Sequence, residues 1–232
     1  MNPRQLALDL GHRPALGQDD FLVAGPNAEA VAWLDRWPDW PSAGLVLHGP
    51  AGCGKSHLVN VWRARSGARA VARSDLTDDG VAALIEGAAH AALDDAEAAL
   101  GAGAAAERAL FHLYNALKEG SGTLLVAART PPARWRIGLA DLASRMSALP
   151  AVAVRPPDDA LIAAVLVKLF ADRQLQVDQA VLDYLTARME RSFGAAQTLV
   201  DAIDREALAH RRRITVPFVA EVLQTLGPKH QA

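Results

Sequence analysis

The 232-residue sequence predicts an α/β protein in which a five-stranded parallel sheet, covered by helices on both faces, is followed by a helical domain. The first observation behind this prediction is that short apolar runs alternate with segments of helical apolar spacing through the first two thirds of the chain. The second is that no strand-like run longer than a few residues follows Pro156-Pro157.

The α/β part is expected to begin with a helix, because apolar residues recur at helical spacing between residues 27 and 37. Five short, apolar, β-capable runs predict strands at residues 44–48, 69–73, 90–94, 123–128 and 151–154. Helical spacing predicts helices at 57–65 and at about 76–89, 104–118 and 138–147. The alanine-rich stretch 96–107 is expected to be a loop that leads into a helix, because it contains glycines and shows no clear apolar face.

The C-terminal part carries four amphipathic patterns, which predict helices at 158–173, 178–190, 193–210 and 216–226. Asp158, Asp178 and Thr215 are the expected N-caps, because their short polar side chains can accept a hydrogen bond from a free backbone N–H. The predicted domains are therefore a tail at residues 1–20, an α/β domain at 21–155 and a helical domain at 156–232.

Composition and charge limit the classes of function. The chain has 24 Lys and Arg against 26 Asp and Glu, a net charge of -2, which argues against duplex DNA binding as the main activity. The single cysteine, Cys53, excludes a disulfide framework and a cysteine-based zinc site. The N-terminus lacks the apolar core of a signal peptide, and charges interrupt every apolar stretch. We expect a soluble, cytoplasmic protein with no membrane partner.

A phosphate-binding loop lies between the first strand of the sheet and the helix after it. The eight residues that match the pattern GxxxxGK[ST] are Gly49, Pro50, Ala51, Gly52, Cys53, Gly54, Lys55 and Ser56. The glycines let backbone N–H groups surround phosphate oxygens, Lys55 neutralises the outer phosphates, and Ser56 can bind Mg²⁺. The motif stands between a strand and a helix, so a nucleotide site is favoured over a chance glycine-rich turn.

Two aspartates end the apolar run about 40 residues after this loop. Asp94 is the candidate Mg²⁺ ligand together with Ser56, and Asp95 is the candidate residue that orients the attacking water. An aspartate pair that only caps the following helix is the ordinary alternative. Two arginines, Arg145 and Arg191, stand out only through their positions, before the last strand and at the start of a C-terminal helix.

These motifs resemble the AAA+ family of P-loop NTPases, and within it the DnaA group with its shortened, Hda-type regulators. The resemblance covers nearly the whole chain and rests on the phosphate-binding loop and on residues 21–30, 93–95, 110–117, 128–135, 142–146 and 191–223. It implies an AAA+ α/β core with a C-terminal helical lid, and ADP or ATP with Mg²⁺ as cofactors. It implies that the segment from Phe21 packs near the adenine and that Arg191 contacts the nucleotide from the lid. The candidate nucleotide-binding residues are thus the loop, the adjoining His57, Phe21, Val23 and Arg191.

The resemblance also implies that Arg145 is an arginine finger, which acts on nucleotide held by a neighbouring subunit. Three departures from DnaA matter. The basic DNA-binding domain that follows the lid in DnaA is not found here, residues 96–107 contain no Lys or Arg, and alanines 127 and 128 stand where a polar sensor residue is usual. We therefore expect no sequence-specific DNA binding and weak or absent hydrolysis of the chain's own nucleotide.

The N-terminal tail contains a hexapeptide that resembles sliding-clamp-binding motifs. Gln5 would bind a small polar pocket, while Leu6, Leu8 and Leu10 would fill an apolar one. A first strand or a short helix of the parent domain is the alternative interpretation of this segment.

The leading hypothesis is a regulator of replication initiation that docks on the sliding clamp and promotes hydrolysis of DnaA-bound ATP through Arg145. The alternative is an initiator- or helicase-loader-like ATPase that runs its own ATP cycle on DNA. A small-molecule P-loop kinase is disfavoured by the alanine-rich insert and the four-helix ending. The sequence leaves open whether ADP or ATP is the working ligand and whether the protein forms a homo-oligomer. It also leaves open the affinity for the clamp and for DnaA.

Overall fold

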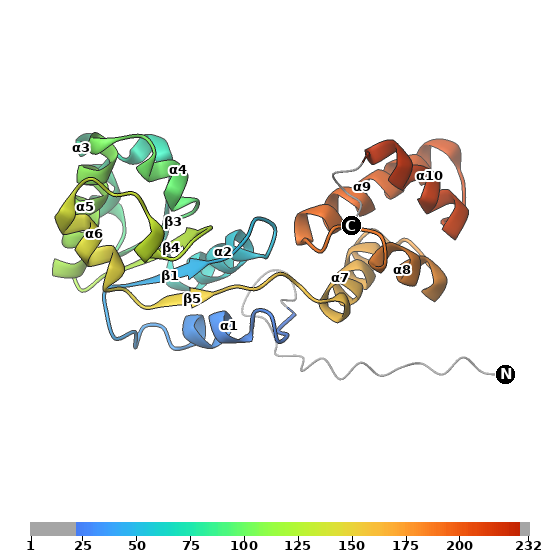
Figure 1. Ribbon diagram of the computed structural model, residues 1–232, viewed down its shortest axis with the longest axis horizontal. Helices are drawn as coiled ribbons and strands as arrows, with labels where there is room; N and C mark the ends of the chain where they lie inside the picture. Colours follow the sequence, from blue (N-terminus) through green and yellow to red (C-terminus); the bar gives the residue numbers. More distant parts are fainter. Residues whose placement is uncertain (1–21, 228–232) are drawn as a thin grey trace.

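A computed structural model describes residues 22–227. They form an α/β part and a helical part joined by an extended segment after the last strand (Figure 1). The five strands are β1 (Gly44–His48), β2 (Arg69–Val71), β3 (His90–Leu93), β4 (Thr123–Ala128) and β5 (Ala151–Ala153). They pair in parallel, as predicted, and their order in the sheet is β2-β3-β4-β1-β5. Their carboxyl ends therefore share one edge of the sheet.

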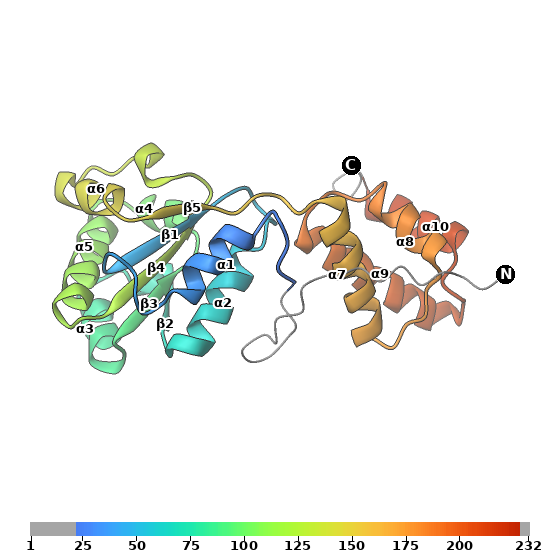
Figure 2. The ribbon, with the colours of Figure 1, turned by 90° about the horizontal axis from the view of Figure 1, so that it is seen from below.

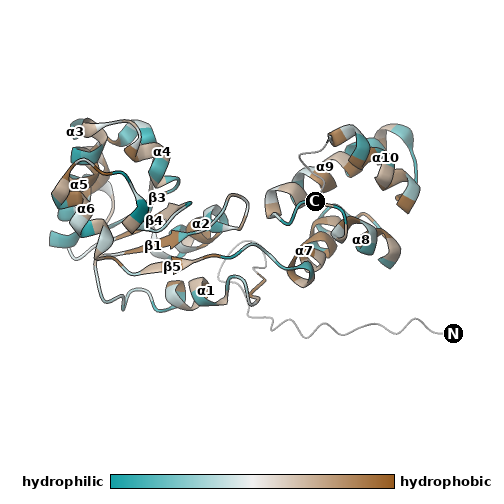
Figure 3. Ribbon diagram, in the orientation of Figure 1, coloured by the Kyte–Doolittle hydropathy of each residue, from teal (hydrophilic) through white to brown (hydrophobic). Residues whose placement is uncertain are grey.

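Helices cover both faces of the sheet because each strand is apolar on both sides. On one face lie α3 (Asp78–Gly87), α4 (Ala96–Leu100), α5 (Ala104–Glu119) and α6 (Ala140–Ser147), and on the other lie α1 (Ala28–Asp35) and α2 (Lys55–Ser66) (Figure 2). Two short 3₁₀ turns, η1 (Arg73–Asp75) and η2 (Pro132–Arg134), follow β2 and β4. In Figure 3 the helices carry both apolar and polar residues, as expected of helices that pack on the core with one side and face solvent with the other.

The two main differences from the prediction in the α/β part concern α4 and the start of α2. The stretch expected to be a loop contains α4, because Ala96, Ala99 and Leu100 are all buried and give this short helix an apolar side built from small residues. The helix after the phosphate-binding loop begins at Lys55 and not at residue 57, because the last two residues of the motif form its first turn.

The helical part has a core of its own. It consists of α7 (Asp159–Asp172), α8 (Gln179–Thr186), α9 (Phe193–His210) and α10 (Val216–Leu226). Asp158 caps α7 as predicted, accepting a hydrogen bond from the Leu161 N–H at 2.8 Å, whereas Asp178 and Thr215 occupy N-cap positions without a side-chain bond. The second of the four predicted helices, 178–190, was too long at its C-terminus, because α8 ends at Thr186.

A cluster of aromatic rings fixes α1 and α2 to the amino edge of the sheet. The Trp40 ring stacks on Trp62 with centroids 5.5 Å apart, and Trp37 meets Trp62 edge-on at 6.0 Å. Trp37 Nε1 donates to the Thr123 hydroxyl at 3.2 Å, which leaves that hydroxyl's own hydrogen for His90 Nδ1 at 2.9 Å. The neutral His90 ring with its hydrogen on Nε2 satisfies this chain of bonds. Burial lowers the pKa of His90.

The burial of His90 makes stability depend on pH. The native pKa lies below that of the unfolded chain, about 6.5, so the unfolded state binds more protons between the two values and stability falls as the pH drops through this window. Urea unfolding from pH 7.5 to 5.5 should show this loss for the wild type. The slope should be smaller for His90→Asn, whose amide oxygen can accept from Thr123 without titrating. Identical slopes in both proteins would contradict the assignment.

Candidate nucleotide-binding site

The phosphate-binding loop connects β1 to α2 in a conformation that only glycines adopt freely. Gly52 and Gly54 have φ angles of 74° and 100°, in the left-handed region. Gly49 is required for a different reason, because a Cβ there would lie 2.1 Å from the Val154 carbonyl oxygen, which follows β5. The sequence thus leaves room for backbone alone, which is the geometry that exposes successive N–H groups to an anion.

Lys55 opens α2 and folds its side chain back over the loop. Its ammonium group donates to the carbonyl oxygens of Gly49 and Pro50, at 2.7 Å each, and lies 3.7 Å from the Cys53 sulfur. The Cys53 side chain is buried beneath the loop, whereas Ser56 and His57 are exposed on the first turn of the helix. The positive charge is therefore held at the loop's concave side, where it can meet phosphate oxygens.

Asp94 and Asp95 lie at the same edge of the sheet, directly after β3. Both side chains are exposed, and the Asp95 N–H donates to the Asp94 carboxylate at 3.0 Å. Asp95 has a φ of 54°, an unusual backbone conformation for a residue other than glycine. Its side chain does not cap α4, so the capping alternative is not what the structure shows for Asp95.

Two residues at this edge, His48 and Glu97, were not predicted as site residues from the sequence. His48 ends β1 opposite Ala128 of β4, and burial, followed by the charges of Arg134 and Lys55, lowers its pKa. Glu97 of α4 accepts from the N–H groups of Arg129 and Thr130, at 2.8 and 2.7 Å, and from the Thr130 hydroxyl at 3.0 Å. Although burial opposes it, these hydrogen bonds lower the pKa of Glu97. The carboxylate thereby fixes the ends of β3 and β4 together.

The start of α9 covers the loop from the helical part. The Phe193 N–H donates to the Gly52 carbonyl at 3.0 Å. A Cβ on Gly52 would lie 2.5 Å from the Ser192 Cβ, and one on Gly54 would lie 2.9 Å from the Phe193 ring. Beside this contact lies a cavity of about 360 Å³, lined by residues that include Leu22, His57, Leu161, Val165 and Phe193. The loop and the helical part therefore share one concave site.

The chain that precedes α1 forms one wall of this site. Leu22 lines the cavity, and Val23 is partly buried without lining it. The buried Asn27 side chain holds this segment, accepting from the Ala24 N–H at 2.8 Å and donating to the Leu22 carbonyl at 3.0 Å. The candidates Phe21, Gln5, Leu6, Leu8 and Leu10 lie outside the described residues.

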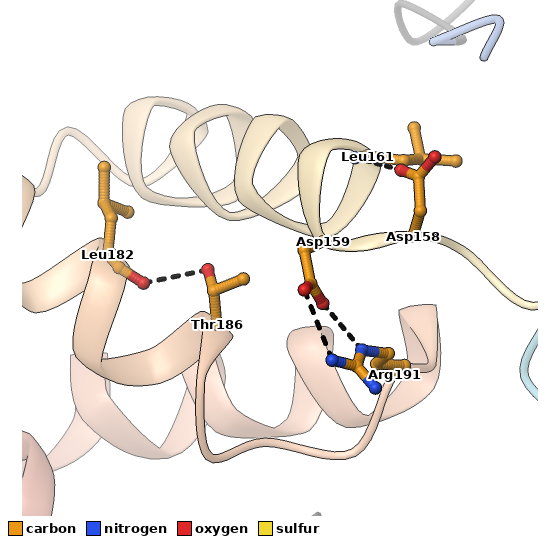
Figure 4. A network of polar contacts seen from close by, with 6 residues as sticks. All are labelled: Asp158, Asp159, Leu161, Leu182, Thr186 and Arg191. Carbon is orange, nitrogen blue, oxygen red and sulfur yellow. Dashed lines mark hydrogen bonds and ion pairs between the residues drawn. The ribbon is translucent and has the colours of Figure 1, made fainter. Parts of the chain in front are cut away.

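Arg191 immediately precedes the covering residues, but its side chain is engaged within the helical part. Its guanidinium donates to both oxygens of Asp159, at 2.6 and 3.2 Å, at the start of α7 (Figure 4). Both side chains are exposed; the hydrogen bonds to Arg191 lower the pKa of Asp159, and those to Asp159 raise the pKa of Arg191. This ion pair joins the starts of α7 and α9 and holds Arg191 one residue away from the loop contact.

Arg145 belongs to a different part of the surface. It lies in the last turn of α6, partly exposed, and its guanidinium carbon is 5.1 Å from the centre of the Phe111 ring of α5. Asp141, the acid four residues earlier, forms no ion pair with it among the described residues. The charge of Arg145 is therefore available to an external anion.

The contact between Gly52 and Ser192 can be tested against a matched glycine. Gly52→Ala and Gly67→Ala both place a side chain at positive φ, at a cost of about 1–2 kcal/mol, but only Gly52→Ala meets another residue. Backbone amides of residues 193–197 should exchange hydrogen faster in Gly52→Ala and at the wild-type rate in Gly67→Ala. Mass spectrometry of deuterium uptake measures both. Unchanged uptake in Gly52→Ala would show that the loop does not hold the start of α9.

Comparisons with known proteins agree with this architecture. Residues 159–223 match the family model of the Hda lid domain. Domain III of the Thermotoga maritima replication initiation protein DnaA shares 15% identity over 88% of this chain and 94% of that chain, with a TM-score of 0.78. DnaA from Aquifex aeolicus bound to AMPPCP shares 18% identity over 82% and 66%, with a TM-score of 0.63. A Thermotoga maritima RuvB mutant shares 15% over 87% and 68%, with a TM-score of 0.66.

The likeness to the solved structures lies in the fold, and the chain spans about two thirds of the length of the Aquifex DnaA chain. The family model adds that the helical part is similar to the Hda lid domain, since the match covers α7 to α10 almost from end to end. The described residues therefore combine an α/β fold like that of the solved DnaA structures with a helical part that matches the model of the Hda lid domain.

Proposed function

We propose that this protein regulates replication initiation by promoting the hydrolysis of ATP bound to DnaA. In this proposal it binds an adenine nucleotide itself, docks on the DNA sliding clamp through Gln5, Leu6, Leu8 and Leu10, and presents Arg145 to the nucleotide of DnaA. The observation that carries the proposal is the arrangement of two separate sites: a glycine loop covered by an Hda-type lid, and a partly exposed arginine on α6 that forms no ion pair within residues 22–227.

The loop residues fit a nucleotide. A Cβ at Gly49, Gly52 or Gly54 would lie 2.1, 2.5 or 2.9 Å from Val154, Ser192 or Phe193, so only glycines let the loop keep this closed shape, and Lys55 already lies over the loop. Ser56 and Asp94 supply oxygen ligands of the kind that Mg²⁺ uses together with nucleotide phosphates. When bound, Mg²⁺ neutralises phosphate charge. A DnaA structure bound to AMPPCP and single-stranded DNA and one bound to AMPPCP alone support an adenine nucleotide as the ligand.

Slow turnover of the chain's own nucleotide follows from the end of β4. Ala127 and Ala128 place no polar side chain there, and the nearby Thr130 hydroxyl donates to Glu97. Asp95 is the candidate to orient a water, but Ala127 and Ala128 offer no side-chain donor to a terminal phosphate. We therefore propose that the bound nucleotide mainly stabilises the arrangement of loop and lid.

No helix within residues 22–227 is long and apolar enough to cross a membrane. The net charge of -2 supports a protein that reaches DNA through a partner and has no sequence-specific affinity of its own.

Nucleotide binding is tested by Lys55→Ala. ADP with Mg²⁺ should raise the melting temperature of the wild type, because a ligand that binds only the folded state adds about 2.7 kcal/mol of stability at a hundredfold excess over its Kd. The rise should be absent in Lys55→Ala and fully retained in Lys118→Ala, which removes an exposed lysine at the end of α5. Differential scanning fluorimetry measures the shifts. An unchanged rise in Lys55→Ala would remove the loop from the proposal.

The arginine finger is tested by Arg145→Ala in an assay of DnaA-bound ATP with clamp and DNA. Arginine fingers are worth roughly 10³–10⁵ in rate, so stimulation should disappear while folding and ADP binding stay near wild type. Arg145→Lys should not restore it, because an ammonium lacks the planar guanidinium fork. Arg188→Ala is the control, since Arg188 also stacks on a ring, that of Tyr184 at 4.0 Å, but lies in the lid.

A second control separates docking from chemistry. The Gln5→Ala/Leu6→Ala variant should lose stimulation only because it no longer stays on the clamp, so raising its concentration should restore the rate. Raising the concentration of Arg145→Ala should not. Full stimulation by Arg145→Ala would overturn the finger and favour an ATPase that uses its own cycle.

A further inference from the structure

Helix α6 carries Arg145 but has weak means of holding its own position. It has eight residues, too few for a stable isolated helix in water. Its N-cap residue is Leu139, whose side chain accepts no hydrogen bond, so the first backbone N–H groups need an acceptor from elsewhere. Leu142 and Met146 are fully buried and anchor one side of the helix, but apolar contacts alone fix neither its direction nor its rotation.

Glu107 of α5 supplies an acceptor for the backbone just before the helix. Its side chain is 7% exposed, and its two carboxylate oxygens accept from the N–H groups of Gly138 and Leu139 at 3.0 and 2.8 Å. A charged carboxylate at this end of a helix also meets the positive end of the helix dipole. Burying a carboxylate is costly unless hydrogen bonds compensate, so this residue is committed to the start of α6.

Phe111 lies four residues after Glu107, on the same face of α5. Its partly buried ring packs against the core, and the Arg145 guanidinium carbon is 5.1 Å from its centre. An arginine above an aromatic face is held by the ring's quadrupole while its N–H groups remain free at the edges of the guanidinium plane. One face of α5 therefore fixes both the start of α6 and the side chain near its end.

We propose that Glu107 and Phe111 are positioning residues for Arg145: Glu107 sets the direction of α6, and Phe111 holds the guanidinium in the conformation that reaches a partner's nucleotide. This inference rests on the proposed function of Arg145. It assigns no contact with the partner to either residue. Losing either one should therefore lower the maximal stimulated rate without changing the concentration of this protein that gives half of it.

The test compares four variants in the assay of DnaA-bound ATP. Glu107→Gln, which keeps the size of the side chain but provides only one accepting oxygen, should lower the maximal rate at least tenfold, with the half-saturating concentration within twofold of wild type. Phe111→Leu should lower the maximal rate as well, and Phe111→Tyr should keep it because the ring is retained. Leu117→Ala removes a buried side chain from the far end of α5 and controls for lost stability; its maximal rate per folded molecule should stay at wild type.

Hydrogen exchange gives a readout that does not depend on DnaA. Amides of residues 138–143 should take up deuterium faster in Glu107→Gln than in the wild type, and those amides should be unaffected in Leu117→Ala. Unchanged uptake in Glu107→Gln, or faster uptake with a wild-type maximal rate, would overturn the positioning role.

The proposal and its foundation fail in different ways. If Arg145→Ala is inactive while Glu107→Gln and Phe111→Leu reach the full rate, the positioning role is wrong and the finger stands. If Arg145→Ala keeps full stimulation, the finger is wrong and the positioning role is wrong with it.

Discussion

The phosphate-binding loop is confined on two sides, and the rest of the site depends on this confinement. A side chain at Gly49 would collide with the Val154 carbonyl at 2.1 Å, and one at Gly52 would collide with Ser192 at 2.5 Å. The residue after β5 and the residue before α9 thus both pack closely against the same loop. Because folded interiors transmit strain, a loop that shifts around a phosphate would have to shift one of these neighbours. These contacts would therefore couple the proposed nucleotide site to the helical part.

The carboxyl edge of the sheet gathers acidic groups with different tasks. Glu97 directs its carboxylate to N–H groups at the end of β4, while Asp94 and Asp95 remain exposed after β3. The hydrogen bonds that lower the pKa of Glu97 keep it charged and bound to the backbone. The exposed aspartates are thereby left to the proposed contacts with Mg²⁺ and water, while Glu97 holds the segment after β3 to the end of β4.

The sequence predicts the sheet, the loop and the lid helices well because each has a local signal. Apolar runs define β1 and β4 to the residue, and the glycine pattern locates the loop. Helix α4 was missed because its buried side consists mostly of alanines, which carry little apolar signal. Glu97 and Glu107 were missed because their partners are backbone N–H groups 31 to 33 residues away, and backbone acceptors leave no trace in side-chain patterns.

The two halves of the proposed activity rest on different supports. The nucleotide loop depends on β5 and the lid, whereas Arg145 depends on α5 through Glu107 and Phe111. Lys55 lies on α2, whereas the residues that contact α6 and Arg145 lie on α5. These two helices pack on opposite faces of the sheet. Since distant, independent contacts contribute additively, a change in one support should leave the other intact. The proposed function, in which the protein keeps its own nucleotide while acting on that of a partner, requires this separation.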